Sequence, residues 1–227
     1  MVTGIRTKFA LDSLKEERMK DDILVCFSGG LDTTLITLKY LNSGGSVIPF
    51  WVDYNQWEVR EQTKSMERVL DWLSPRGHLH PLVKVKAELP GGPIGHSSGR
   101  ILMSLGLAVM YADRVGSIRI IATGYRGISH YPESAEPMQI LMRQSLEKLG
   151  YIYQTPLLGM SKSQIGKELA MYNVPWRLMD SCYWSPPCGT KSENDTYLCG
   201  GCRNKVEAMR AAGVTNPELL RRPNVNP

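Results

Sequence analysis

The sequence predicts an α/β fold, with a doubly wound, mostly parallel sheet and a small C-terminal zinc-binding subdomain. Two observations predict it. Short apolar runs alternate along the 227-residue chain with longer segments whose apolar residues recur at helical spacing, and this alternation is typical of a parallel sheet with helices on both faces. Four cysteines are clustered near the C-terminus, which indicates a unit built around a metal ion.

Each predicted strand is a short, mainly apolar run. In chain order these runs cover 23–26, 47–52, 80–85 and 117–123, and residues 151–158 are extended. Each predicted helix has an apolar face; Pro137 lies in the first turn of one helix, and Ser161 is the expected N-cap of another. In chain order the helices cover 35–41, 58–73, 100–115, 137–149 and 161–172.

The composition is that of an ordinary globular protein, with 42% hydrophobic and 22% charged residues. No apolar run approaches the roughly 20 residues that a membrane-spanning helix needs, and the polar N-terminal stretch lacks the core of a signal peptide. We therefore expect a cytoplasmic protein with no membrane partner. The net charge of +5 suits anionic substrates such as ATP, but it is weak support for nucleic-acid binding.

The first predicted strand runs into a glycine turn and then into a helix. A glycine pair lets backbone amides approach a bound anion, and the new helix presents its unpaired amides and positive dipole end to the same anion. The turn therefore predicts a phosphate cradle, with a plain strand-to-helix turn capped by Asp32 or Thr33 as the alternative. The cradle residues are Ser28, Gly29, Gly30, Leu31, Asp32, Thr33 and Thr34.

Ligands of doubly wound sheets bind at the carboxyl ends of the strands. Three features of the sequence fall at such ends. They are the cradle, the pair Asp53 and Tyr54 after the second strand, and the long loop that begins at Gly124. Long loops in compact domains are often functional, so the pattern predicts one crevice shared by all three features.

The four clustered cysteines are Cys182, Cys188, Cys199 and Cys202. Because the sequence has no secretory features, they predict a closed, structural zinc site rather than disulfides. Four unliganded thiols are one alternative. A nucleic-acid-binding zinc ribbon is another, because Arg203, Lys205 and Arg210 add positive charge beside the cluster, although no aromatic stripe accompanies them. Cys26, in the first strand, is expected to act as a small buried hydrophobe.

The order Ser-Gly-Gly-x-Asp-Thr resembles the pyrophosphate-binding loop of the ATP pyrophosphatase superfamily, which splits ATP between its α and β phosphates. Together with the four-cysteine site, it is similar to the pattern of QueC-type 7-cyano-7-deazaguanine synthases. Further matches follow in the same order along nearly the whole chain. They are Asp53-Tyr54-x-Gln56 with Glu61, Gly99-Arg100, Thr123-Gly124 with Tyr131-Pro132, Thr155-Pro156-Leu157 with Lys162, and Ser181-Cys182-Tyr183.

This resemblance implies an adenine nucleotide alpha hydrolase-like fold. Its parts would be an N-terminal extension at 1–21, an ATP pyrophosphatase-type domain at 22–175, and a zinc subdomain with its tail at 176–227. It also implies an enzyme, a C–N ligase that adenylates the carboxylate of 7-carboxy-7-deazaguanine. Ammonia, free or supplied by a partner, then displaces AMP to give an amide, and a second activation gives the nitrile preQ0. The implied cofactors are ATP, Mg²⁺ and structural Zn²⁺.

The resemblance also implies roles for residues. Asp32 would orient Mg²⁺ or hold the loop, and as a plain helix cap it would look the same. Arg100 and Lys162 would neutralise pyrophosphate, with surface salt bridges as the alternative. These three residues are the catalytic candidates. Nucleotide contacts fall to the cradle residues, Asp53 and Gly124. The candidate acceptor-binding residues are Tyr54, Gln56, Glu61, Tyr131, Pro132 and Glu133.

The chain departs from the family pattern at Asn55, Ser98, 127–130 and Glu133. These departures bear on the acceptor rather than on ATP. A related carboxylate, a halted amide product, or a protein or tRNA acceptor is therefore an open alternative for the same ATP chemistry. A non-catalytic, zinc-bearing binder of nucleic acid or nucleotide is a second alternative. Whether the chain forms a homodimer is also left open.

Overall fold

The computed structural model describes residues 22–56, 58–87, 99–127, 136–183 and 198–215. Within these residues, six strands form one sheet in which every pair of neighbours is parallel. This arrangement confirms the predicted α/β class. The strands are β1 (Asp22–Cys26), β2 (Ser46–Asp53), β3 (His78–Leu79), β4 (Val83–Lys86), β5 (Ile120–Thr123) and β6 (Ile152–Gln154).

The strand order is β3-β2-β1-β5-β6, and β4 also pairs with β2. The predicted strand at 80–85 is wrong in one respect, because it is replaced by two short strands along the same edge of β2. β3 pairs with the start of β2, and β4 pairs with its end. Pro81 lies between the two short strands and has no amide hydrogen to donate to the ladder, which accounts for the break.

The helices lie close to their predicted ranges, and α1 begins earlier than its apolar run predicts. That early start places Asp32 and Thr33 in the first turn of α1. A short 3₁₀ turn, Ser74–Arg76, follows α2. The helices are α1 (Leu31–Asn42), α2 (Val59–Leu73), α3 (Arg100–Val115), α4 (Glu136–Lys148), α5 (Lys162–Met171) and α6 (Gly200–Ala211).

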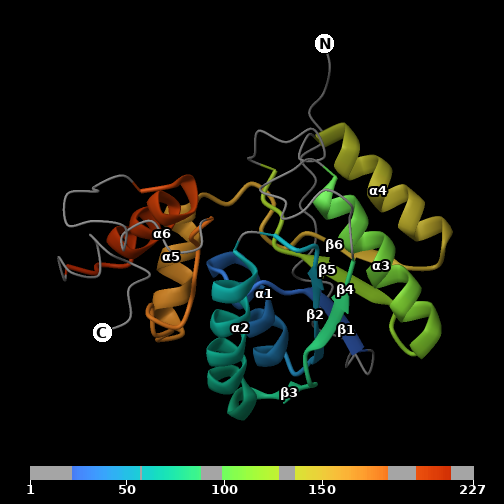
Figure 1. Cartoon of the computed structure of the whole chain (residues 1–227), viewed down its shortest axis with the longest axis horizontal. Coiled ribbons are helices and arrows are strands. Elements are labelled where there is room, and N and C mark those ends of the chain that lie inside the picture. The colour runs from blue at the N-terminus through green and yellow to red at the C-terminus, as the bar shows by residue number, and fades with distance from the viewer. Residues whose placement is uncertain (1–21, 57, 88–98, 128–135, 184–197, 216–227) are drawn as a thin grey trace.

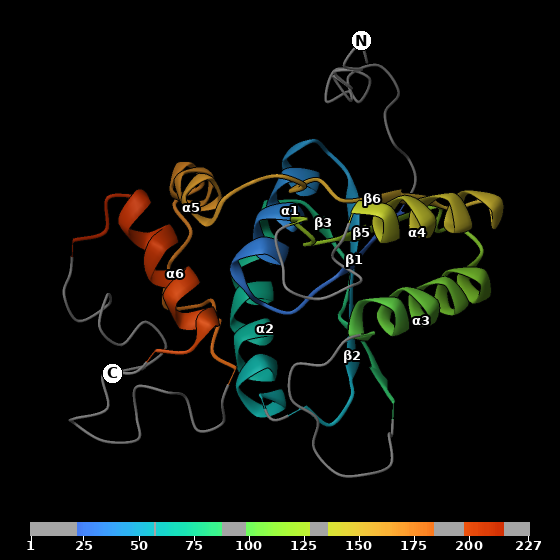
Figure 2. The ribbon, with the colours of Figure 1, turned by 90° about the horizontal axis from the view of Figure 1, so that it is seen from above.

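Helices cover both faces of the sheet, as Figures 1 and 2 show, with α1 and α2 on one face and α3 and α4 on the other. Successive side chains of a strand point to opposite faces. Accordingly, Ile23 and Val25 of β1 pack into the core that includes α1 and α2, whereas Leu24 packs into the core that includes α3. The chain is therefore doubly wound, as its sequence predicts.

Helices α5 and α6 lie beyond α1 and α2 in both views (Figures 1 and 2). They pack closely, because a Cβ on Gly166 of α5 would lie only 2.0 Å from the carbonyl oxygen of Ala208 in α6. Ala208 and Ile165 belong to the same hydrophobic core as α1. The chain after β6 is thus anchored on the α1–α2 side of the sheet. Among the described helices, none combines the length and the hydropathy that a membrane span requires.

Candidate active site and metal centre

The glycine turn after β1 contains two glycines, and the backbone conformation requires glycine at one of these positions. Gly29 has φ of +69°, and a Cβ there would lie 2.8 Å from the amide nitrogen of Met66 in α2. Gly30 is different, because its φ of −84° and ψ of 176° suit any residue and a Cβ would meet its nearest neighbours at 3.4 Å. The fold therefore requires glycine at position 29 but not at position 30.

No side chain among the described residues caps α1, so neither Asp32 nor Thr33 is the helix cap that the plain-turn alternative expects. The hydroxyl of Thr33 instead closes the turn, because it accepts a hydrogen bond from the amide of Ser28 at 3.2 Å and lies 3.4 Å from the carbonyl oxygen of Gly30. The first amides of a helix have no partner within the helix. Together with the helix dipole, they make this end of α1 suitable for an anion.

Two glycine variants separate folding from binding at this turn. We expect Gly29→Ala to lose roughly 3 kcal/mol of stability, because the added methyl group meets backbone atoms at a positive φ. Gly30→Ala should keep a melting temperature within a few degrees of the parent, while its methyl group would crowd a phosphate bound beside the amides. Thermal melts and ATP titration of both variants check this expectation, which fails if Gly30→Ala binds ATP as the parent does.

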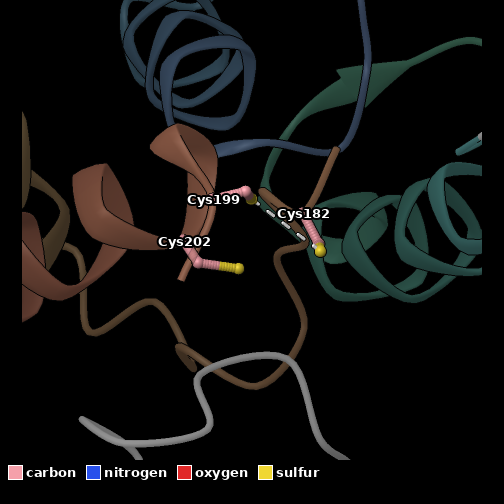
Figure 3. Close-up of side chains that lie close together, drawn as sticks. All are labelled: Cys182, Cys199 and Cys202. Atoms are coloured by element: carbon pink, nitrogen blue, oxygen red, sulfur yellow. Dashed lines mark hydrogen bonds between the residues drawn. The ribbon is translucent and has the colours of Figure 1, made fainter. Parts of the chain in front are cut away.

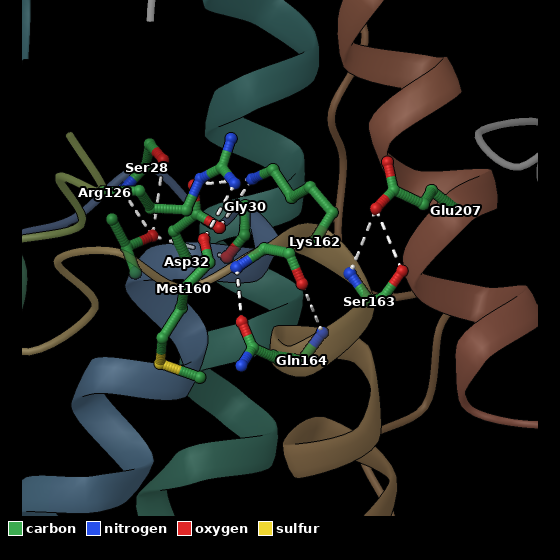
Figure 4. A network of polar contacts seen from close by, with 11 residues as sticks. Ser28, Gly30, Asp32, Arg126, Met160, Lys162, Ser163, Gln164 and Glu207 are labelled. Carbon is green, nitrogen blue, oxygen red and sulfur yellow. Dashed lines mark hydrogen bonds and ion pairs between the residues drawn. The ribbon is translucent and has the colours of Figure 1, made fainter. Parts of the chain in front are cut away.

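A compact group of charges lies at the same end of α1 (Figure 4). Lys162, the first residue of α5, donates to both carboxylate oxygens of Asp32, at 2.6 and 2.7 Å. Arg126 approaches the same carboxylate, with its Nε atom 3.8 Å from Oδ2, and it donates to the carbonyl oxygen of Met160 at 3.1 Å. Two cations and a helix N-terminus thus surround one carboxylate, which leaves excess positive charge for a ligand.

The position of Lys162 is set by the start of α5. Ser161 caps this helix, as predicted, through a capping box with Gln164. The amide and the hydroxyl of Ser163 both donate to the Glu207 carboxylate of α6, at 3.2 and 3.0 Å (Figure 4). Burial lowers the pKa of Lys162, and the neighbouring Asp32 carboxylate opposes that effect. Because Lys162 is buried, its contact with Asp32 is not a mobile surface pair.

Gly124 follows β5 and lies directly against the cradle. A Cβ there would lie 3.0 Å from Cβ of Asp32 and 3.1 Å from Cγ2 of Thr33. The sequence pattern identifies Gly124 but not Arg126, two residues further along. The sequence offers one signal for Arg126, a positive charge shortly after the carboxyl end of a strand, and this signal is too weak to distinguish it from the other arginines of the chain.

The end of β2 carries several other candidate residues, and they bond to one another. Gln56 accepts a hydrogen bond from the amide of Tyr54 at 2.8 Å, and the hydroxyl of Tyr54 donates to the carbonyl oxygen of Arg100 at 3.1 Å. The Arg100 guanidinium lies 3.2 Å from the Glu58 carboxylate. Tyr54, Gln56 and Glu58 are all buried. The structure therefore groups Arg100 with the end of β2, whereas Lys162 lies at the cradle.

The remaining candidate residues form contacts with near neighbours in the sequence. Asp53 accepts a hydrogen bond from the amide of Asn55 at 2.7 Å, and Asn55 has a positive φ of 59°. Glu61 lies 3.6 Å from the ammonium of Lys64 in the same helix. The other acceptor-binding candidates, Tyr131, Pro132 and Glu133, lie outside the described residues.

Three of the four cysteines come together, as Figure 3 shows. The sulfur atoms of Cys182, Cys199 and Cys202 all lie within 4.8 Å of one another, and those of Cys182 and Cys199 are 3.9 Å apart. A tetrahedral zinc ion with bonds of about 2.3 Å places its sulfurs about 3.8 Å apart, so the three thiols fit such an ion. Cys188, the fourth predicted ligand, lies outside the described residues.

The start of α6 favours thiolates at this site. Cys199 is the N-cap of α6, and Cys202 lies in its first turn, where the helix dipole stabilises negative charge. Hydrogen bonding with Cys182 and Cys202 lowers the pKa of Cys199. By contrast, burial raises the pKa of Cys26 to about 12, so this partly buried thiol beside the cradle is a poor nucleophile.

Lys205 corrects the picture of α6 as a basic surface. The sequence groups it with Arg203 and Arg210, which are exposed, but Lys205 is fully buried. Its ammonium donates to the carbonyl oxygen of Met179, and burial lowers its pKa to about 8. Lys205 therefore supports the segment that leads to Cys182 and adds nothing to a nucleic-acid-binding face.

Comparisons with known proteins agree with this geometry. The model of the family described as queuosine biosynthesis protein QueC matches residues 84–213, which is more than half of the chain. A 7-cyano-7-deazaguanine synthase of Nautilia profundicola is 24% identical over 84% of this chain and 94% of its own length. Synthases of the same name from Campylobacter fetus and Oceanobacillus iheyensis are 27% and 26% identical, over 85% and 86% of this chain and 94% and 96% of their own lengths.

The family model covers the chain from β4 to α6, including Lys162 and the cysteine cluster. The relatives extend the similarity to most of the chain at 24–27% identity. The chain therefore belongs to the QueC family of queuosine biosynthesis proteins.

Proposed function

We propose that the protein is an ATP-dependent ligase that joins AMP to the carboxylate of 7-carboxy-7-deazaguanine and then replaces AMP with ammonia. The observation that carries this proposal is the charge group at the start of α1. Lys162 and Arg126 converge on Asp32 beside an uncapped helix N-terminus. Such a site suits a triphosphate that leaves as pyrophosphate, because it offers cations and amides to the charge that develops on the leaving group.

Three features of the described residues fit a bound phosphate chain. The first amides of α1 have no cap. The fold would accept a side chain at position 30, yet the residue there is glycine, which leaves the backbone amides accessible. The hydroxyl of Thr34 is buried without a hydrogen-bond partner among the described residues, and a buried polar group of this kind calls for a ligand or water.

The chain's own residues have distinct parts in the proposed reaction. The amides of the turn and of α1 bind the β and γ phosphates, and Lys162 and Arg126 neutralise them as the bond to the α phosphate breaks. Asp32 keeps both cations in place before ATP arrives and is the candidate ligand for the Mg²⁺ that accompanies ATP. A carboxylate is a poor electrophile, so AMP supplies the leaving group that ammonia displaces. One activation yields the amide, and a second yields the nitrile.

We further propose that Cys182, Cys188, Cys199 and Cys202 hold a structural zinc ion. Four thiolates close the coordination sphere, so the ion would shape the protein and take no part in the reaction.

Mass spectrometry of the product tests the proposed acceptor. The zinc-loaded protein is incubated with ATP, Mg²⁺, ammonium and 7-carboxy-7-deazaguanine. We expect the amide to appear with one AMP per product and the nitrile with two. Omission of ammonium should stop both products, and Gly30→Ala is the matched variant that keeps the fold. Absence of AMP above background with this acid would contradict the acceptor, and AMP formed with a different carboxylic acid would redirect it.

A further inference from the structure

Ser65 is a fully buried serine within α2 that joins three separate parts of the chain. Its Oγ atom lies 2.9 Å from the carbonyl oxygen of Gly29 in the cradle. The same atom lies 3.0 Å from the carbonyl oxygen of Leu178 and 2.8 Å from the amide nitrogen of Asp180. One hydroxyl thus connects α2, the glycine turn and the segment that leads to the metal centre.

The chemistry of a hydroxyl makes this connection hard to replace. It has one hydrogen to donate and two lone pairs, so it accepts from Asp180 and shares its hydrogen between two carbonyl groups. Ser65 has 0% of its surface exposed, so bulk water cannot take over these bonds. Without the hydroxyl, the buried carbonyl of Gly29 and the partly buried carbonyl of Leu178 and amide of Asp180 would lose this partner, and folded proteins avoid such a loss.

The segment 178–182 is held from its other side by the metal centre. The amide of Cys182 donates to the Asp180 carboxylate at 2.9 Å, and Lys205 of α6 donates to the carbonyl oxygen of Met179. The carbonyl oxygen of Ser181 rests on the first turn of α6, because a Cβ on Gly201 would lie 1.7 Å from it. The segment is therefore fixed between Ser65 and the cysteine cluster.

The same segment also borders the cradle directly. A Cβ on Gly30 would lie 3.4 Å from the carbonyl oxygen of Asp180. A shift of the segment would therefore move one wall of the cradle and, through Ser65, the carbonyl group of Gly29. We propose that Ser65 is a positioning residue that couples the metal centre to the nucleotide cradle, so that metal bound to the cysteines holds the cradle in its binding shape.

The inference rests on the proposed function for the identity of the nucleotide, but the mechanical link does not need it. Hydrogen exchange of the wild-type protein, with zinc bound and after its removal by a chelator, tests the link alone. We expect the amides of residues 28–32 to exchange about tenfold faster without zinc, in the range of typical coupling between sites. Amides of α3, on the opposite face of the sheet, should not change. Unchanged exchange at 28–32 would overturn the inference.

Should zinc removal unfold the whole chain, zinc-loaded Ser65→Ala gives the same comparison, because the bridge is then broken with the metal in place. Faster exchange at 28–32 in this variant supports the inference, and wild-type exchange contradicts it. Thr63→Val is the matched control. It removes a hydroxyl two residues away on α2, where Thr63 donates to the carbonyl oxygen of Val59 within the same helix, at 2.8 Å.

Thermodynamic linkage between zinc binding and nucleotide binding provides a second test of the bridge. If zinc strengthens ATP binding through Ser65, the Kd for Mg-ATP should rise about tenfold when zinc is removed from the wild type. In Ser65→Ala the same removal should change Kd less than about twofold, whereas Thr63→Val should behave as the wild type. A full wild-type ratio in Ser65→Ala overturns the inference. Absence of ATP binding in every form would refute the proposed function instead, and the exchange experiment would still decide on the bridge.

Discussion

Replacing Lys162 by methionine is expected to lower kcat for AMP formation by roughly 10²–10³-fold, the usual cost of losing one preorganised charge donor at a reacting group. Methionine keeps much of the length of lysine without its charge. The Asp32 carboxylate would then face the leaving pyrophosphate with one cation fewer, because the contacts at 2.6 and 2.7 Å are lost. Steady-state AMP formation at saturating ATP measures the effect.

Lys39→Met is the matched control for that experiment. Its ammonium also pairs with a carboxylate, that of Glu168 at 2.5 Å, but both side chains are 26% exposed. Exposed pairs contribute about 0–1 kcal/mol to stability, and Lys39 lies in the last turn of α1, away from the cradle. We expect the parent rate. Wild-type kcat in a folded, zinc-loaded Lys162→Met protein would remove Lys162 from the reaction.

Gly201→Ala is expected to abolish zinc binding. The added methyl group would lie 1.7 Å from the carbonyl oxygen of Ser181 and 2.9 Å from the Tyr183 ring, so the backbone between Cys182 and α6 must move. Sulfur atoms that now lie within 4.8 Å of one another would then separate. We expect the zinc content measured by atomic spectroscopy to fall to near zero and the stability to fall by about 3 kcal/mol or more.

The adjacent glycine provides the comparison. Among the described residues, a Cβ on Gly200 would meet only the Tyr183 ring, at 3.5 Å, which is ordinary contact. Gly200→Ala should therefore keep its zinc and its melting temperature, since alanine also suits the first turn of a helix better than glycine does. Equal zinc content in the two variants would show that the close approach of Ser181 to α6 does not hold the cysteine cluster together.

Local signals in the sequence predicted the sheet, most of the helices and the glycine turn at the start of α1. Apolar alternation placed β1 between helix-covered faces, and the glycine turn identified the start of α1. The break at Pro81 was missed because the run at 80–85 is apolar enough to predict one strand. In the structure, two short strands, β3 and β4, pair with β2 instead. Lys205 was misplaced for a related reason, because charge alone does not reveal which face of α6 packs on Met179.

The residues that sequence reasoning missed act over long separations. Ser65 contacts Gly29 and Leu178, which lie 36 and 113 residues away, and nothing around a serine within a charged helix indicates either partner. Arg126 becomes a candidate through its contact with Asp32, which lies in the first turn of α1. By contrast, Lys162 was a candidate from the sequence because it stands in a motif, and the structure places it against Asp32.

Phosphorus NMR of ATP turnover tests the central claim most directly, namely that the turn after β1 holds the phosphate chain while a carboxylate is joined to AMP. With zinc-loaded protein, Mg²⁺, ammonium and the deazapurine acid, we expect AMP and pyrophosphate in equal amounts. Signals of ADP and orthophosphate, or equal turnover by Gly30→Ala, would contradict the account.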